Sequence, residues 1–138
     1  MLSSLNMPGS LKPGVVALCD AVYKDEATNK IVIAGLYAGN VITDGAPDDM
    51  RFALYAEFVL PDNNPHDLDI QFWIGKAQVG GARSQVLQPP DARNVSLMLN
   101  QFTLQGTLPG TLSVKACLDG GRPIKILEKD LLLRSPTA

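Results

Sequence analysis

Apolar and polar residues alternate with a period of two along most of the chain, which predicts a protein built from β-strands. The clearest alternation runs from Met50 to Leu60 and again from Leu68 to Ile74. Because successive side chains of a strand point to opposite faces, each segment has one apolar and one polar face. The turn-forming stretch Pro61 to Asp67 separates them. We therefore expect the two strands to pair as a hairpin.

A second hairpin is predicted near the C-terminus. The alternating runs Thr111 to Leu118 and Ile124 to Leu133 flank the sequence Asp119-Gly120-Gly121. Asp-Gly is a preferred turn dipeptide between antiparallel strands. We expect the last strand to be long enough to bring Leu131 and Leu133 to the core.

The N-terminal third predicts shorter strands. Val15 to Tyr23 is apolar on both sides except for Asp20, whose carboxylate needs hydrogen-bond donors if it is buried. Lys30 to Tyr37 is a second strand, in which Gly35 indicates a bulge or a close approach of another group. Val41 to Thr43 is at most a short edge strand.

The middle of the chain contains two irregular segments. Lys76 to Gln85 is rich in glycine and predicts a connection, followed by a short strand near Ser84 to Leu87. From Arg93 to Gln105 the apolar phase jumps at Asn100-Gln101. Such a jump predicts a β-bulge or a break between two short strands.

These segments amount to seven or eight strands, and no segment has a helical repeat. The predicted fold class is all-β: an antiparallel two-sheet sandwich of immunoglobulin-like or fibronectin-like type, with a small barrel as the alternative. We expect a flexible N-terminal arm at residues 1–13, a single β-sandwich domain at 14–134 and a tail at 135–138.

Composition excludes some classes of function. The 138-residue chain has a net charge of −2 and a pI of about 5.2, so no overall field attracts nucleic acid or an anionic membrane. The N-terminus lacks the pattern of a secretory signal, and we expect a cytoplasmic protein. In that reducing compartment Cys19 and Cys117 are expected as core or surface residues, although first and last strands can be close enough for a disulfide.

Several short motifs resemble an uncharacterised bacterial family of small single-domain β-sandwich proteins, a domain of unknown function. They are Leu18-Cys19-Asp20, the stretch from Asn29 to Tyr37, and the turns Pro109-Gly110-Thr111 and Leu118-Asp119-Gly120. The resemblance spans about Gly14 to Leu133. It implies a single β-domain in a bacterial or phage setting and supplies no catalytic residues. The chain departs from the family pattern in its longer Asp25 to Asn29 turn and its Gly-rich Lys76 to Ala82 segment.

The loop after Leu60 holds the candidates for metal or catalytic chemistry. Asp62, Asp67 and Asp69 carry oxygen ligands suited to calcium, although Asp and Asn are also ordinary turn formers. His66, the sole histidine, is expected in an exposed turn; with Asp67 or Asp69 it is also the centre of a possible hydrolase. No nucleophile elbow or phosphate-binding glycine motif is present. We expect no enzyme activity and no cofactor.

A cluster of aromatic and polar residues is the predicted interaction face. If the hairpin forms, Tyr55 and Trp73 lie on its polar side, flanked by Arg51, Glu57 and Gln71. Exposed Trp, Tyr and Arg are typical of protein-binding hot spots and of platforms that stack on sugars. The alternative is that a loop or the N-terminal arm covers the aromatics as a second small core.

The sequence therefore favours a non-enzymatic interaction or structural module. We expect it to use this face or an edge strand to bind itself, most simply as a homodimer, or a protein partner in a larger bacterial or phage assembly. The alternative function is binding of a small ligand or carbohydrate, assisted by calcium in the Asp62 to Asp69 loop.

Overall fold

The computed structural model describes residues 10–43, 51–104 and 110–133, and within these ranges the protein is all-β without a helix. This confirms that the fold is all-β, as the sequence predicts. The ten strands are β1 (Lys12–Cys19), β2 (Ala21–Lys24), β3 (Ile31–Ala34), β4 (Val41–Thr43), β5 (Phe52–Val59), β6 (His66–Ile74), β7 (Ala77–Val86), β8 (Val95–Phe102), β9 (Gly110–Leu118) and β10 (Ile124–Leu133).

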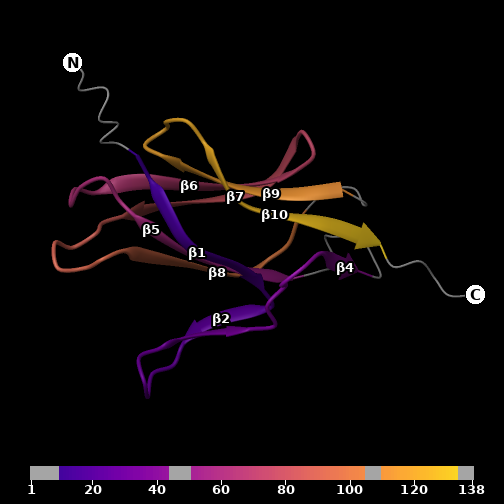
Figure 1. Cartoon of the computed structure of the whole chain (residues 1–138), viewed down its shortest axis with the longest axis horizontal. Coiled ribbons are helices and arrows are strands. Elements are labelled where there is room, and N and C mark those ends of the chain that lie inside the picture. The colour runs from indigo at the N-terminus through magenta and orange to yellow at the C-terminus, as the bar shows by residue number, and fades with distance from the viewer. Residues whose placement is uncertain (1–9, 44–50, 105–109, 134–138) are drawn as a thin grey trace, which may run out of the picture.

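The strands form three sheets (Figure 1). A three-stranded sheet has the order β1-β5-β8, a five-stranded sheet has the order β4-β10-β9-β6-β7, and β2 and β3 pair with each other. In Figure 1 the larger sheet lies above the three-stranded sheet, and the β2–β3 pair lies below it.

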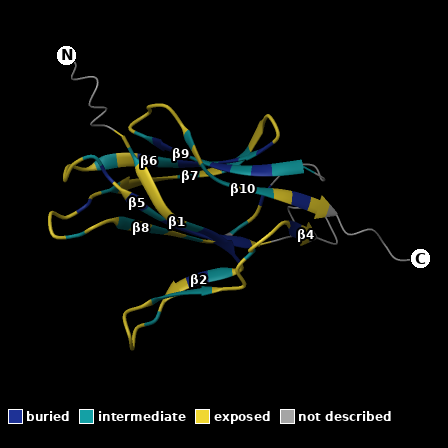
Figure 2. Ribbon diagram, in the orientation of Figure 1, coloured by how far each residue is buried: buried dark blue, intermediate teal, exposed yellow. Residues whose placement is uncertain are grey.

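The main core lies between the two larger sheets (Figure 2). Strand β5 contributes every second residue from Phe52 to Phe58, and β6 contributes every second residue from Leu68 to Ile74. Burying a side chain of this size stabilises the fold by about 1.5–3 kcal/mol. The period of two therefore identified the buried faces of both strands.

The predicted pairing of these two strands is wrong. β5 pairs with β1 and β8, whereas β6 pairs with β7 and β9. The intervening loop crosses from one sheet to the other, so the apolar faces of β5 and β6 contact the same core from opposite sides. Alternation shows which side chains are buried but does not distinguish a hairpin from a connection between sheets.

A second, smaller core lies on the outer face of the three-stranded sheet. The β2–β3 hairpin covers this face, and its members are Ala17, Cys19, Val22, Ala53 and Tyr55, with Ile31 and Ile33 packed against them. The predicted strand from Val15 to Tyr23 is divided at Asp20 into β1 and β2. The break lets the chain leave the edge of one sheet and turn across its outer face.

Asp20 and Gly35 lie against each other at the base of this hairpin. Asp20 is exposed and accepts a hydrogen bond from the Tyr37 hydroxyl at 2.9 Å. Gly35 has a φ of +69°, and a Cβ added to it would lie 2.2 Å from Asp20 Oδ2. The predicted close approach at Gly35 is confirmed, although the glycine follows β3 instead of lying inside a strand.

The strand count and the uniformly antiparallel pairing are also corrected. The described part of the chain alone has ten strands, against the expected seven or eight. The Gly-rich segment from Lys76 to Gln85 is mostly strand β7, because glycine can supply backbone pairing without an apolar side chain to signal it. Val41–Thr43 is an edge strand as expected, but it pairs parallel to Leu131–Leu133 of β10.

Two other predictions are confirmed. β9 and β10 form an antiparallel hairpin around Asp119, and Leu131 is buried in the core. In the β5–β8 ladder, Phe52 opposes Phe102 while Leu54 opposes Leu99, which places a bulge at Asn100-Gln101.

Some predictions fall outside the described residues. They concern the arm from residues 1–9, the Pro109 turn, the tail at 135–138 and the side chain of Leu133. β1 already begins at Lys12, inside the predicted arm 1–13.

Both cysteines are buried as free thiols. Cys19 lies in β1 and Cys117 in β9. The Cys117 thiol donates to the Gly121 carbonyl at 2.8 Å, and burial raises the pKa of the Cys19 thiol above its ordinary value. Of the two expectations for these residues, the core position is the one observed.

Candidate functional site

The predicted aromatic face is divided between two sheets. Tyr55 lies on the outer side of β5, is 7% exposed and belongs to the small core under the β2–β3 hairpin. Its hydroxyl donates a hydrogen bond to Glu57, and burial together with that bond raises the pKa of Tyr55 to about 12. The alternative of a second small core therefore holds for Tyr55. Arg51 precedes β5 and is exposed.

Trp73 and Gln71 lie on β6, in the five-stranded sheet. Trp73 is half-buried, its indole N–H donates to Gln71 Oε1 at 3.0 Å, and Lys115 Nζ lies 4.8 Å from the ring centroid. The lysine and the indole form a cation–π contact. Trp73 and Tyr55 therefore do not share a surface, and the five predicted residues do not form one site.

The four outer edges of the two larger sheets differ in how they are protected. β1 carries Lys12, Pro13 and a register irregularity before Val16, and β4 has only three residues. Proline, lysine, bulges and short length are the usual means of blocking an edge. By contrast, β7 has ten residues with no proline and one charge, Arg83, and β8 has eight residues with neither proline nor charge, so each of these edges carries only a single register irregularity.

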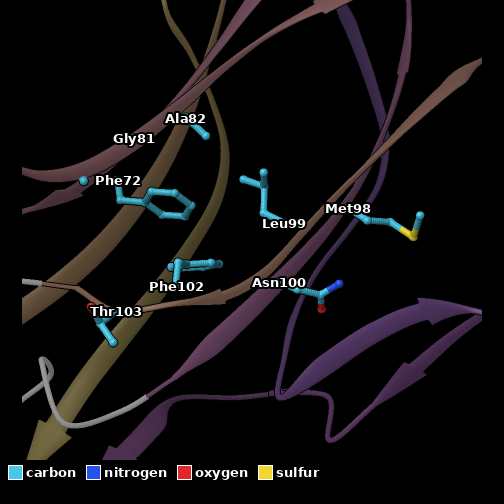
Figure 3. Close-up of a pocket in the computed structure, with 9 residues that line it drawn as sticks. Phe72, Gly81, Ala82, Met98, Leu99, Asn100, Phe102 and Thr103 are labelled. Carbon is cyan, nitrogen blue, oxygen red and sulfur yellow. The ribbon is translucent and has the colours of Figure 1, made fainter.

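A cleft of about 300 Å³ with both apolar and polar lining opens between β7 and β8 (Figure 3). The aromatic rings of Phe72 and Phe102 lie 4.5 Å apart, measured between their centroids. On the β7 side the wall consists of small residues, and on the β8 side it consists of larger ones. The lining residues are Phe72, Gly80, Gly81, Ala82, Met98, Leu99, Asn100, Phe102 and Thr103. The less protected edges of the two sheets therefore flank the same cleft.

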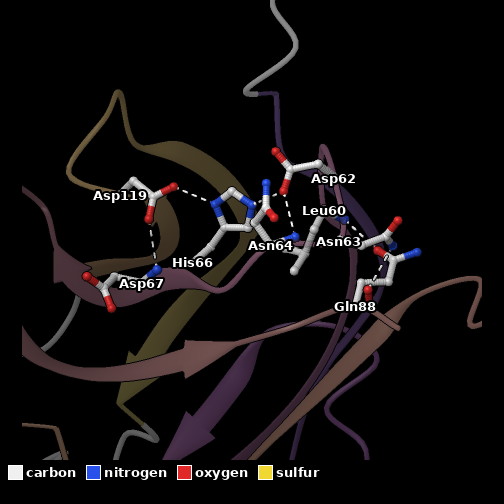
Figure 4. Close-up of polar contacts among 8 residues, drawn as sticks. All are labelled: Leu60, Asp62, Asn63, Asn64, His66, Asp67, Gln88 and Asp119. Atoms are coloured by element: carbon white, nitrogen blue, oxygen red, sulfur yellow. Dashed lines mark hydrogen bonds and ion pairs between the residues drawn. The ribbon is translucent and has the colours of Figure 1, made fainter. Parts of the chain in front are cut away.

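A polar cluster joins the loops at one end of the molecule (Figure 4). His66 begins β6, and its side chain is 11% exposed. Its Nδ1 lies 2.6 Å from Asp119 Oδ2 and its Nε2 lies 2.7 Å from Asp62 Oδ1. Because a carboxylate only accepts hydrogen bonds, both contacts are hydrogen bonds when both ring nitrogens carry a proton.

The shape of the β9–β10 turn places Asp119 beside the imidazole. Asp119 and Gly120 both have positive φ, +52° and +72°, and the Gly121 N–H donates to the Leu118 carbonyl at 2.9 Å. This is a type I′ turn, in which aspartate tolerates the left-handed conformation. Asp119 Oδ1 also accepts from the backbone N–H of Asp67 at 2.8 Å, which fixes the turn to β6.

Gln88 joins the β5–β6 loop to the loop after β7. Its side chain is buried, accepts from the Leu60 N–H at 2.8 Å and donates to the Ala92 carbonyl at 3.0 Å. Asn63 donates in turn to the Gln88 carbonyl at 2.8 Å. Three connections at this end of the fold are thus held together by side-chain hydrogen bonds.

The structure does not combine the predicted metal and catalytic residues as expected. The histidine is paired with Asp62 and Asp119 and not with Asp67 or Asp69, and the Asp67 carboxylate points away from the ring (Figure 4). Asp69 Oδ2 instead accepts from Gln71. Within residues 10–43, 51–104 and 110–133, no group of three or more His, Cys, Asp and Glu side chains could hold a metal ion.

Sequence analysis missed the role of Asp119 and the extent of β7. Asp119 is separated from His66 by 53 positions, and it was assigned only as a turn residue. The available signal was the Asp-Gly turn itself, because it fixes a carboxylate at the end of the β9–β10 hairpin. The cleft depends on the pairing of distant strands and has no local signal.

Comparison of the sequence with models of known protein families found no match, and comparison with curated proteins found none either. In the part of the chain that the structure describes, no helix is long and apolar enough to cross a membrane.

Proposed function

We propose that the protein is a non-enzymatic interaction module that binds a second copy of itself by adding a strand to the edge of β7. The observation that carries the proposal is the contrast between edges. β1 and β4 are blocked or short, whereas β7 presents ten residues with a single charge beside the cleft. A long edge without charges or proline is a template for another strand.

A second copy of β7 is a suitable occupant. Two antiparallel β7 strands related by a twofold axis at Ala82 would place each Arg83 opposite Gly81 of the other copy. Glycine has no side chain to obstruct the arginine, and the like charges do not face each other directly. The small residues Gly80 and Ala82 line the cleft, which allows the two backbones to approach closely.

The surroundings of His66 support a role without catalysis. Both ring nitrogens contact a carboxylate, at 2.6 and 2.7 Å, so neither is directed at a substrate. A general base needs a nitrogen within reach of the proton that it removes. The polar cluster is better suited to joining loops than to chemistry.

The proposal also includes the type of β-sandwich and the cellular setting of the protein. Two sheets around a shared apolar core support an immunoglobulin-like sandwich, to which the β2–β3 hairpin is an addition. The sequence resemblance supports a cytoplasmic bacterial or phage setting, in which a self-associating module would form part of a larger assembly.

The test introduces a positive charge in one variant and a negative charge in another at Ala82, the residue proposed to face its own copy across the twofold axis. Sedimentation at increasing concentration is expected to show a dimer for the wild type. Ala82→Lys and Ala82→Glu are each expected to be monomeric, because like charges meet at the axis. Mixing the two variants is expected to restore a dimer, since lysine then faces glutamate.

The matched control is Ile42→Lys, an exposed position on the opposite edge strand β4, which is expected to leave the dimer intact. A wild type that stays monomeric at the highest concentration contradicts the proposal. So do lysine and glutamate variants that dimerise individually. Circular dichroism of each variant verifies that it is folded.

A small apolar ligand is the second candidate occupant, favoured by the size of the cleft. A volume of about 300 Å³ lies at the lower end of the range for ligand pockets. This moves the ligand-binding alternative from the predicted aromatic face to the space near Phe72 and Phe102. Binding of a fluorescent apolar probe to the wild-type monomer, together with loss of that binding in Ala82→Phe, would support the ligand-binding alternative.

A further inference from the structure

His66 lies between two connections at one end of the fold. Asp62 belongs to the β5–β6 loop, and Asp119 belongs to the β9–β10 turn. The imidazole contacts both carboxylates, and its side chain is 11% exposed. The histidine is therefore the bridge through which the loop carboxylate and the turn carboxylate are held together.

We infer that Asp62, His66 and Asp119 form a proton-dependent clasp, which holds the β5–β6 loop to the β9–β10 turn while the imidazole is doubly protonated and releases Asp62 when the imidazole loses a proton. A neutral imidazole has one N–H and one nitrogen lone pair. It can donate to only one carboxylate, and its lone pair repels the other. One of the two contacts must therefore break.

The backbone decides which contact breaks. Asp119 is fixed by its own N–H, which donates to the Asp67 carbonyl at 2.8 Å, and by Oδ1, which accepts from the Asp67 N–H. Asp62 is held by the Asn64 N–H at 2.9 Å, a bond within its own exposed loop. The loop can move without breaking bonds to β6. The remaining proton accordingly stays on Nδ1, beside Asp119.

Among the described residues, Asp119 and Asp62 are the charged groups that act on the pKa of the ring. Hydrogen bonds to Asp119, first, and to Asp62 raise the pKa of His66 above its ordinary value, against the opposite effect of burial. The neighbouring Asp67 carboxylate points away (Figure 4), and β7 presents Val86 opposite His66. The proton on His66 thus depends on two carboxylates from two different connections.

Release of Asp62 would loosen more than one contact. The same loop is joined to the connection after β7 through Asn63 and Gln88. Loss of the clasp leaves the loop joined to that connection by this bond and by the bond from the Leu60 N–H to Gln88 Oε1. The order of the β5–β6 loop then depends on pH in the range where histidine titrates.

NMR of the imidazole tests the clasp directly, because His66 is the only histidine in the chain. In ¹⁵N-labelled wild-type protein, His66 is expected to titrate above its ordinary pKa of 6.5. The neutral form is expected to carry its proton on Nδ1. The amide signals of Asn63 and Asn64 are expected to shift with the same midpoint, while those of Asp67 and Asp119 stay protected from exchange.

Three variants complete the test. Asp119→Asn is expected to lower the His66 pKa more than Asp62→Asn does, because the Asp119 contact is the shorter one, at 2.6 against 2.7 Å, and its carboxylate is fixed to β6. Asp91→Asn, in the exposed loop after β7, is the matched control and is expected to leave it unchanged. A wild-type pKa at or below 6.5, a neutral ring protonated on Nε2, or loop amides that ignore the titration would each overturn the inference.

Discussion

The side-chain oxygen of Asn100 accepts a hydrogen bond from the backbone N–H of Val22 at 3.1 Å. Asn100 lies at the bulge of β8, and Val22 is a buried residue of the β2–β3 hairpin. The bulge turns a polar side chain outward at the point where the hairpin crosses the sheet. The bulge in β8 thus anchors the β2–β3 hairpin that covers Tyr55.

Replacement of this asparagine should weaken the cover. Asn100→Ala leaves the Val22 N–H without its acceptor in a partly buried site, and we expect a loss of about 1 kcal/mol in the free energy of unfolding. Urea denaturation measures it. Asn94→Ala, at an exposed position before β8, is the control and is expected to change stability by less than about 0.5 kcal/mol. Equal effects of the two substitutions would contradict the proposed anchor.

Gly35→Ala should be destabilising for two separable reasons. The residue has a φ of +69°, and the new Cβ would lie 2.2 Å from Asp20 Oδ2 and 2.8 Å from its Cβ. We expect a loss of about 1–3 kcal/mol, measured by denaturation. Gly39→Ala is the control, because its Cβ would meet nothing within 4 Å. Adding Asp20→Ala to Gly35→Ala should recover the part due to the clash with the carboxylate and leave the backbone strain and the 2.8 Å contact with the Cβ of residue 20.

Phe58→Ala should affect the main core strongly. Phe58 is fully buried between the two larger sheets, and truncation leaves a cavity that costs about 3–5 kcal/mol. Thermal or urea unfolding measures the change. Val59→Ala, next along the same strand but 39% exposed, should cost about 1 kcal/mol or less. Similar losses of stability at both positions would contradict the assignment of Phe58 to the core face of β5.

The His66 clasp predicts a maximum in stability at mildly acidic pH. The pKa of His66 is raised in the folded state, so its contribution is complete below about 6.5 and is lost as pH rises through the folded pKa. The pKa values of Asp62 and Asp119 are lowered, chiefly by hydrogen bonds with the Asn64 N–H and with His66 respectively. Their contribution is present above about pH 3.8 and is lost as pH falls through the folded values.

The measurement is the free energy of unfolding of wild type and His66→Gln from pH 3 to pH 9. We expect the difference between the two proteins to be largest between about pH 4 and 6.5 and to shrink on both sides. A difference that is constant across the whole range would contradict a charged clasp.

Local pattern was sufficient to predict the strands with strong alternation but not their partners. The faces of β5, β6, β9 and β10 follow from side chains such as Phe58 and Leu68, because period two reports burial directly. Whether β5 lies beside β6 or across the core from it depends on how the loop after Leu60 turns. That information is in the packing of both sheets and not in the alternation.

The candidate sites could be predicted less well for the same reason. His66 and Asp62 are four positions apart in one predicted loop, but the sequence pointed to Asp67 or Asp69 as the partner of the histidine, and Asp119 joins the pair only after β9 has paired with β6. The cleft is formed by β7, whose glycines gave no apolar pattern, and by β8 from the other sheet. Tyr55 and Trp73 were assigned to one face solely because the hairpin was expected.

The order of the five-stranded sheet has a consequence for the timing of synthesis. β10 lies between β4 and β9, and residues 41–43 of β4 pair with residues 131–133. A ribosome must therefore release the chain as far as residue 133 before this edge can close, and contacts between such distant residues form slowly. Until β10 has emerged, the five-stranded sheet that covers the apolar side of β5 is incomplete. The nascent chain is therefore most prone to aggregation just before β10 emerges.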